Sequence, residues 1–329
     1  MRADVTRLDA EYVLPIRWEQ DAAREQLTTY LSWLSTYLDI TVVDGSPQPL
    51  FDAHARDWAP FARHLGVEPW PGRNGKVAGV MTGVRHARHE LLVIADDDVR
   101  YDEASLRRLV GLLGAADVVR PQNYFCLLPW HARWDTARTL INRAIAVDYP
   151  GTLGVRRSAL LATGGYDGDV LFENRELICT VRASGGRERR ANDLFVARVP
   201  PTWRHFMSQR VRQAYDDFAQ PARLGTELMM LPLLVWALRR WKTTVGIVAA
   251  ACILAETGRR RENGRSVFPA TSLLWAPVWV VERAVCIWIA LGMRATGGVR
   301  YAGGRVKRAG SSMSSIRRRQ ADRTMKRQG

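Results

Sequence analysis

Residues 91–98 read LLVIADDD: five apolar residues, Leu91–Ala95, followed by three acids, Asp96–Asp98. A short, continuous apolar run is typical of a strand that is buried on both faces of a parallel sheet. Ligands of open α/β sheets bind beyond the carboxyl ends of such strands. Three adjacent carboxylates repel one another, and hard oxygen ligands of this kind suit a divalent cation. The run therefore predicts a strand that ends in a metal site, with a solvated acidic turn as the alternative.

The residues before this run predict a β-α-β-α-β order. Tyr12–Ile16 reads as a first strand, and residues 27–38 carry apolar side chains at helical spacing. Ile40–Val43 is a second, β-branched strand, and the turn-forming residues after it place Asp44 at another strand end. Residues 77–84 have the pattern of a second helix. This alternation predicts an α/β fold with a mainly parallel sheet.

The sequence pattern becomes less regular after Asp98. Residues 103–113 and 176–183 have helical patterns, and residues 117–119 suggest a short strand. Between residues 122 and 148 Trp, Pro and His occur without a clean period. This part is either an insertion that faces the substrate or an irregular piece of core.

The C-terminal third is rich in apolar residues and Trp. The runs 228–238 and 245–255 are separated by the basic segment 239–242, and a longer run covers residues 270–293. A spanning helix needs about 20 apolar residues, so the first two runs fit an interfacial or hairpin arrangement. The third is long enough to span, although the charges at residues 282–283 are costly in lipid. The alternative is a set of buried helices in a soluble domain.

The net charge of +15 over 329 residues is unevenly distributed. Residues 300–329 contain ten Lys or Arg and one acid, Asp322, so this tail carries +9 and the rest of the chain +6. The tail has too few large apolar residues to fold alone, which predicts disorder over residues 297–329. Its apolar neighbours favour an anionic membrane surface as partner. Nucleic acid is not expected, because no zinc spacing, RNA-binding aromatic signature or helix-turn-helix pattern is present.

Cysteine usage and the N-terminus bear on the compartment. The four cysteines are far apart and form no C-x-x-C pair, so neither a structural zinc site nor a disulfide framework is expected. The first nine residues lack the apolar core of a secretory signal peptide. We expect the catalytic part at the cytoplasmic face of the cell membrane, attached or spanning through the C-terminal helices.

A succession of motifs resembles the family 2 glycosyltransferases. The strand ends VLPI and VVDGS are followed by NGKVAGVMTGV and then by the acids. Next come Gly164–Asp167 and residues 172–177 (FENREL), similar to the segment that carries the family's catalytic acid pair. Residues 209–213 (QRVRQ) resemble the Q-x-x-R-W motif of membrane-associated members. The resemblance covers residues 12–213 and implies a GT-A-like nucleotide-diphospho-sugar transferase domain over 1–223, membrane-associated helices over 224–296 and a basic tail over 297–329.

The resemblance also implies site residues and a cofactor. A bound Mg²⁺ or Mn²⁺ would be held by Asp98 and Asp96, with His205 as a third ligand. The remaining roles implied are catalysis by Glu173 and Arg212, and donor binding by Pro15, Asp44, Lys76, Asp96 and Gln209.

The implied activity is inverting transfer of a sugar, of hexosyltransferase type, from a nucleotide-diphosphate donor to a lipid-linked or cell-envelope acceptor. Two departures from the family qualify it. Asn174 stands where a second acid is usual, and an amide cannot take a proton at neutral pH, so Glu173 is the expected base. Gln213 replaces the final Trp, which argues against polymer synthesis.

The sequence leaves two alternatives to the transferase. A catalytically inactive relic that acts as a membrane-associated binding protein is the main alternative, motivated by Asn174. A nucleotidyltransferase would need a Gly-rich phosphate loop after the first strand, and residues 17–20 contain no glycine.

Overall fold

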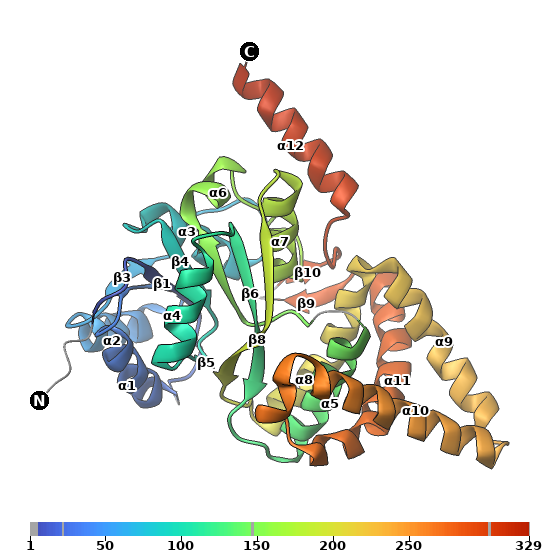
Figure 1. Cartoon of the computed structure of the whole chain (residues 1–329). Coiled ribbons are helices and arrows are strands. Elements are labelled where there is room, and N and C mark those ends of the chain that lie inside the picture. The colour runs from blue at the N-terminus through green and yellow to red at the C-terminus, as the bar shows by residue number, and fades with distance from the viewer. Residues whose placement is uncertain (1–5, 22, 146–147, 302–303, 329) are drawn as a thin grey trace, which may run out of the picture. The chain divides into compact units, whose positions relative to one another are not determined.

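The computed structural model describes residues 6–21, 23–145, 148–301 and 304–328 (Figure 1). The chain forms two compact units. The first comprises Met1–Pro121, Pro150–Val196 and Ser311–Gly329, and the second comprises Gln122–Tyr149 and Ala197–Gly310. This division differs from the predicted continuous domain over residues 1–223, because the chain leaves the first unit at residue 122 and returns to it twice.

The first unit is built on alternating strands and helices. Its elements are β1 (Glu11–Ile16), α1 (Arg24–Leu34), β2 (Asp39–Asp44), α2 (Gln48–Trp58), β3 (Arg63–Gly66), α3 (Gly75–His86), β4 (Leu91–Ala95), β5 (Val99–Arg100), α4 (Glu103–Leu112), β7 (Thr152–Arg156), α6 (Arg157–Ala162), α7 (Glu173–Ala183) and α12 (Met313–Gln328). Two longer strands, β6 (Val118–Phe125) and β8 (Glu188–Arg198), lead from this unit into the second.

The sheet contains both parallel and antiparallel pairs. Among the described residues its order is β3-β2-β1-β4-β7-β6-β8-β5. The pairs β2–β3, β1–β2 and β1–β4 are parallel, whereas β7 runs antiparallel to both β4 and β6. The predicted parallel sheet is therefore confirmed for the first four strands. Their carboxyl ends lie at one edge, where β2 ends at Asp44 and the residues after β4 begin with Asp96.

Alternate side chains of β1 pack on opposite faces of the sheet. Tyr12 and Leu14 belong to a buried cluster with the apolar residues of α1 and α4. Val13 and Pro15 face α3 on the other side, where Gly79 and Gly83 permit close approach. A Cβ built on Gly83 would lie 2.3 Å from Val13 Cγ1, so only glycine lets α3 pack this closely on β1. This packing fixes the position of the first turn of α3.

The sequence did not indicate several elements, and three of them lie in two stretches of the chain. Residues 47–70 contain α2 and β3, and the irregular stretch between residues 122 and 148 contains the 16-residue helix α5 (Trp130–Ile145). The buried face of α5 includes polar side chains such as Asp135, Asn142 and Arg143. A helix that buries polar residues does not show the apolar period on which sequence patterns depend.

The second unit is mainly helical. Besides α5 it contains α8 (Trp203–Tyr215), η1 (Asp216–Ala219), α9 (Pro221–Ala237), α10 (Trp241–Arg260), η2 (Arg261–Ser266), η3 (Ala270–Trp275), α11 (Ala276–Ala295), β9 (Val299–Tyr301) and β10 (Gly304–Val306). The helices α5, α10 and α11 pack against one another. The charges noted at residues 282–283 lie inside this unit: Arg283, 1% exposed, pairs with Asp217 at 2.8 Å, and Glu282 lies 3.6 Å from Arg210.

The tail differs from the expected disorder. The described residues of 297–328 include β9 and β10, which pair antiparallel, and the helix α12. Helix α12 packs against α7 and buries Ile316. Arg319 pairs with acids and Arg323 donates to backbone carbonyl oxygens far away in sequence, and composition cannot reveal such contacts.

The close contact between α3 and β1 predicts that a larger side chain at Gly83 destabilises the fold. We expect Gly83→Ala to lower the free energy of unfolding by about 1–3 kcal/mol, because its methyl group overlaps Val13. Gly111→Ala in α4 is the matched control: nothing lies within 4 Å of its Cβ, and helix propensity favours alanine by about 0.5–1 kcal/mol. Urea unfolding of the two variants measures both effects. If Gly83→Ala and Gly111→Ala had the same free energy of unfolding, the proposed packing of α3 on β1 would be contradicted.

Candidate active site

Three distant segments of the first unit meet at Lys76. Helix α3 begins after Asn74, whose side-chain oxygen accepts a hydrogen bond from Lys76 N at 3.1 Å, a standard N-cap. Strand β4 ends just before Asp96, whose backbone N–H donates to Gly151 O at 2.8 Å. Helix α7 begins at Glu173. Each residue thus comes from the end of an element, where the backbone is fixed and the side chain can leave the core.

The Lys76 ammonium group bridges two carboxylates. Its Nζ lies 2.5 Å from Asp96 Oδ1 and 2.6 Å from Glu173 Oε1. The Glu173 side chain is 9% exposed, whereas those of Lys76 and Asp96 are about a quarter exposed. Burial by itself would lower the pKa of Lys76, but the charges of Asp96 and Glu173 outweigh burial and raise that pKa well above its usual range. Lys76 is therefore a permanent cation between two anions.

Asn174, the unexpected amide, has a structural partner. Its Nδ2 donates to Pro150 O at 3.0 Å, which fixes the side chain to the backbone next to β7. Glu173, in contrast, faces Lys76. Of these two adjacent side chains, the acid is the one that the structure brings to the strand-end carboxylates.

The acids after β4 divide into two sets. The Trp18 indole N–H donates to Asp97 Oδ2 at 2.5 Å, which engages Asp97 away from the ion group. Asp96 and Asp98 are half-buried at the strand end. Two carboxylates in this position supply the hard oxygen ligands that Mg²⁺ and Mn²⁺ prefer. These residue types suit the predicted divalent cation, and the assignment of Asp96 and Asp98 as its ligands remains a prediction.

Asp44 lies in a buried network that the sequence did not indicate. Its Oδ2 contacts His54 Nδ1 at 2.6 Å and His64 Nε2 at 3.2 Å, and its Oδ1 accepts from Ser46 N at 2.8 Å. The second nitrogen of His54 faces Asp21 at 3.1 Å. Burial favours the protonated acid, but the hydrogen bonds from His64, Ser46 and His54 outweigh it and lower the pKa of Asp44 to about 2.

The same network is a second arrangement of possible metal ligands. One ligand atom from each of Asp44, His54 and His64 lies within 4.8 Å of the others. These atoms also bond to one another, so the cluster is satisfied as a hydrogen-bonded network. Either way, the Asp44 carboxylate is already engaged by two imidazoles, and its donor-binding role remains a prediction.

The other predicted site residues lie elsewhere. Pro15 is in β1, opposite Val43 in the register of the sheet. Helix α8 of the second unit carries His205, Gln209 and Arg212. Arg212 Nη1 donates to Gln209 Oε1 at 3.3 Å, and His205 is exposed in the first turn of the helix. Their roles in metal binding, donor binding and catalysis remain predictions.

A family model matches part of the first unit. The model for Glycosyl transferase family 2 matches residues 13–160, which contain Lys76 and the acids after β4. None of the curated proteins compared with the chain matches its sequence.

Solved structures resemble the fold. One is the mannosyltransferase PcManGT from Pyrobaculum calidifontis in complex with GDP-Man and Mn²⁺, at 20% identity and a TM-score of 0.53, covering 86% of this chain and 87% of that one. Another is glucosyl-3-phosphoglycerate synthase from Mycobacterium tuberculosis with Mn²⁺, UDP and phosphoglyceric acid, at 19% identity and a TM-score of 0.42, covering 60% of this chain and 73% of that one. The first likeness shows a shared GT-A-like α/β fold.

The lowered pKa of Asp44 predicts a pH-dependent contribution to stability. Ionised Asp44 stabilises the folded state above its unfolded pKa of about 3.9, and this stabilisation is lost as the pH falls toward about 2. We expect Asp44→Asn to be less stable than wild type by about 1–3 kcal/mol at pH 7, with the difference shrinking below pH 4. Urea unfolding at several pH values measures it.

The matched control is Asp52→Asn, an exposed aspartate on the neighbouring helix α2. It should change stability by no more than about 0.5 kcal/mol at any of these pH values. A difference between wild type and Asp44→Asn that stays constant from pH 7 to pH 3 would contradict the assignment.

Proposed function

We propose that the protein transfers a sugar from a nucleoside-diphosphate donor to an acceptor hydroxyl, inverting the anomeric carbon. The proposal is supported by the match of residues 13–160 to the model for Glycosyl transferase family 2. The observation that carries the proposal is the meeting of Glu173 with Asp96 through Lys76. It joins an acid on α7, outside the matched residues, to the strand-end acids inside them.

Glu173 has the features of the general base. It is a single carboxylate, largely buried, at the first residue of a helix. In the proposed reaction the acceptor hydroxyl attacks the anomeric carbon while its proton passes to Glu173, and the bond from that carbon to the diphosphate oxygen breaks. A positioned base of this kind contributes about 10²–10⁴ to the rate. Single displacement inverts the anomeric centre.

The leaving diphosphate gains negative charge as the bond breaks, so a cation near it lowers the barrier. A divalent cation held by Asp96 and Asp98 would act there as a Lewis acid. Lys76 compensates the charges of Asp96 and Glu173, which lets two anions lie close together near an anionic substrate. Arg212 is our candidate for a further cation on the diphosphate, and this role rests on the motif resemblance.

The choice of donor follows the fold likeness. PcManGT was solved with GDP-Man and Mn²⁺, so GDP-mannose with Mn²⁺ is the first donor to test, followed by UDP-sugars. For the acceptor we propose a lipid-linked or cell-envelope hydroxyl. The replacement of the terminal motif Trp by Gln213 supports single transfer over polymer synthesis.

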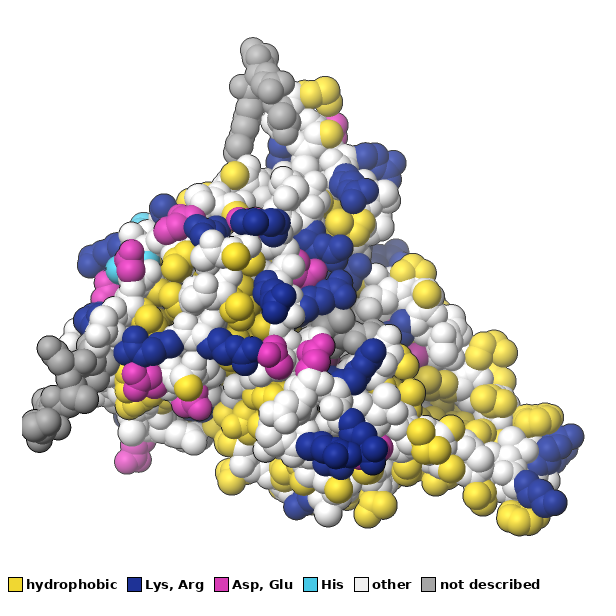
Figure 2. Space-filling view, viewed as in Figure 1, with side chains coloured by type: hydrophobic (Ala, Val, Ile, Leu, Met, Phe, Trp, Pro, Cys, Tyr) yellow, Lys and Arg dark blue, Asp and Glu magenta, His cyan; other side chains and the backbone are white. Residues whose placement is uncertain are grey.

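The proposed acceptor class is supported by the surface of the second unit. Helices α9 and α10 form a hairpin whose apolar side chains are largely exposed (Figure 2), among them Met229, Leu233, Trp236, Val245 and Ile253. An apolar surface of this extent is unusual for a monomeric soluble protein and favours a membrane or a partner.

The positive charge at the end of the hairpin favours a membrane over a protein partner. The turn between the two helices exposes Arg239 and Arg240, and Lys242 follows in the first turn of α10. Arg240 lies over the Trp236 ring at 4.2 Å, and Lys242 over Trp241 at 5.8 Å. Trp beside basic residues suits the boundary between lipid and water, where the cations attract anionic headgroups. We propose that the hairpin lies in the interface at the cytoplasmic face of the membrane.

One helical stretch of the described residues could cross a membrane. Ala270–Ala295, which joins η3 and α11, has a mean hydropathy of 1.6 in its most apolar window, and 39% of that window is buried within the structure. Partial burial equally suits a core helix of the second unit. Attachment through the hairpin does not require this stretch to span.

The catalytic proposal predicts metal-dependent turnover that requires Glu173. With a panel of nucleotide sugars, Mn²⁺ or Mg²⁺ and a lipid extract, one donor should be consumed by wild type. We expect Glu173→Gln to lower kcat about 10²–10⁴-fold with little change in donor binding. Asp98→Ala should lose the metal-dependent turnover. Glu25→Gln, an exposed acid on α1, is the control and should retain activity.

Asn174 distinguishes an enzyme from a relic. If Glu173 is the base, Asn174→Asp should give no gain in turnover, because the new acid loses the hydrogen bond to Pro150 O. A relic that lacks its base would gain activity instead. Donor binding by wild type without turnover of any donor, together with gained turnover in Asn174→Asp, would establish the relic.

The hairpin predicts membrane binding that depends on its two exposed Trp residues. In co-sedimentation with anionic vesicles, we expect Trp236→Ser with Trp241→Ser to reduce binding strongly, and each of Arg239→Gln and Arg240→Gln to reduce it about fivefold, which corresponds to ~1 kcal/mol per cation. The control is Trp203→Ser, an exposed Trp on α8. If the double Trp variant sediments like wild type, the hairpin is not the attachment surface.

A further inference from the structure

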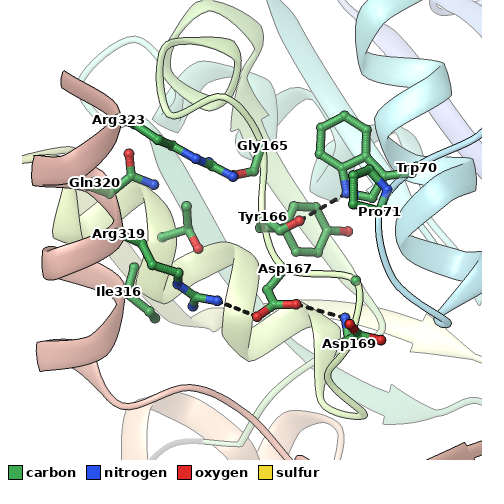
Figure 3. A pocket seen from close by; sticks show the side chains of 12 residues that line it. Trp70, Pro71, Gly165, Tyr166, Asp167, Asp169, Ile316, Arg319, Gln320 and Arg323 are labelled. Atoms are coloured by element: carbon green, nitrogen blue, oxygen red, sulfur yellow. Dashed lines mark hydrogen bonds and ion pairs between the residues drawn. The ribbon is translucent and has the colours of Figure 1, made fainter. Parts of the chain in front are cut away.

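The C-terminal helix α12 contacts the segment that leads into the proposed active site. Its Arg319 pairs with Asp167 (Figure 3). Arg319 also donates to Glu176 Oε1 at 2.9 Å and to Ser311 Oγ at 2.8 Å. Ile316, three residues earlier on the same helix, is buried. One face of α12 is therefore packed against the rest of the first unit by a combination of apolar and ionic contacts.

Glu176 is the centre of this contact. Its side chain is fully buried, one turn after Glu173 on α7. Besides Arg319, the backbone N–H of Ser311 donates to its Oε2 at 2.8 Å, and Arg175 returns a hydrogen bond to Ser311 O at 3.1 Å. A buried carboxylate needs a partner of opposite charge. Arg319 supplies that charge from α12, so the first turns of α7 and the start of α12 are held together.

A second arginine of α12 holds the loop before α7. Arg323 Nη1 donates to Thr163 O at 2.8 Å and to Gly165 O at 3.1 Å. Gly164 and Gly165 have φ values of 71° and 77°, a conformation that glycine adopts without strain. Figure 3 shows Arg319 and Arg323 reaching from the helix to this loop, across a pocket that Trp70 and Tyr166 also line.

The other end of the loop is bonded to the start of α3. The Asn74 backbone N–H donates to Gly168 O at 2.8 Å, and its side-chain Nδ2 donates to Val170 O at 2.9 Å. Asn74 is also the N-cap that holds Lys76. The loop over residues 163–172 thus touches α12 at one end, fixes the cap of α3 at the other, and continues into α7 at Glu173.

We propose that α12 is a clamp on this loop, and that Arg319 is a positioning residue for the Lys76–Glu173 pair. The inference rests on the proposed function for its effect on catalysis, although the clamp itself is a property of the fold. Arg319 acts through Asp167 and Glu176, so its loss displaces Glu173 relative to the acceptor hydroxyl. Small displacements of a catalytic group can lower rates by up to about 10².

The test compares Arg319→Ala with Arg318→Ala in the full-length protein. Arg318 is exposed on the same helix and is the matched control. We expect Arg319→Ala to lower kcat about 10-fold to 10²-fold while donor affinity stays within about twofold. Arg319→Lys retains the charge but cannot fork to two carboxylates, so it should be intermediate. Hydrogen exchange of residues 163–176 should be about 10-fold faster in Arg319→Ala and unchanged in Arg318→Ala.

Either readout can overturn the clamp. Unchanged hydrogen exchange over residues 163–176 in Arg319→Ala would show that α12 does not hold the loop. An equal loss of donor affinity and kcat, with faster exchange throughout the first unit, would show general destabilisation in place of positioning. If wild type turned over no donor, the proposed function would fail, and hydrogen exchange alone would decide whether the clamp exists.

Discussion

The candidate site depends on one ammonium group that compensates two carboxylates. Asp96 and Glu173 come from separate parts of the chain, and Lys76 is 97 residues from Glu173 in sequence. Without a cation between them, two carboxylates at this distance repel each other and one tends to take up a proton. The Lys76 contacts keep both in the same place. The position of Lys76 depends in turn on α3, which the close approach of Gly79 and Gly83 to β1 and β2 fixes on the sheet.

Charge organises the rest of the first unit in the same way. Asp44 is matched by two histidines and a backbone N–H, and Glu176 is matched by Arg319 and the Ser311 N–H. Each buried acid lies beside a loop or an element end, where its partners come from a different part of the chain. These pairs define which loop conformations are compatible with a satisfied interior. Breaking one leaves an uncompensated charge, so the loops near the site are held by electrostatics as well as by packing.

The sequence indicated the parts of the molecule that follow a local period. Tyr12–Ile16, Ile40–Val43 and Leu91–Ala95 are strands because they are short apolar runs, and the strand-end position of Asp96 follows directly. Contacts between distant residues have no such signal. His54 and His64 give no indication in sequence that they meet at Asp44, and the polar buried face of α5 hides its period. The motif resemblance assigned Glu173 to the site, and the structure brings its side chain to Lys76 beside Asp96; position within a motif carries information that periodicity lacks.

The C-terminal tail also shows that composition does not reveal contacts between distant residues. Composition assigned all of its positive charge to solvent or membrane, yet the structure uses Arg319 and Arg323 internally, against α7 and the loop before it. Arg317 and Arg318 stay exposed on α12. The charge available to attract anionic lipid is therefore smaller than the sequence total implies, and the exposed Arg239 and Arg240 of the hairpin gain importance. If α12 clamps the loop, its inward arginines are not free to bind lipid while they hold the loop before α7.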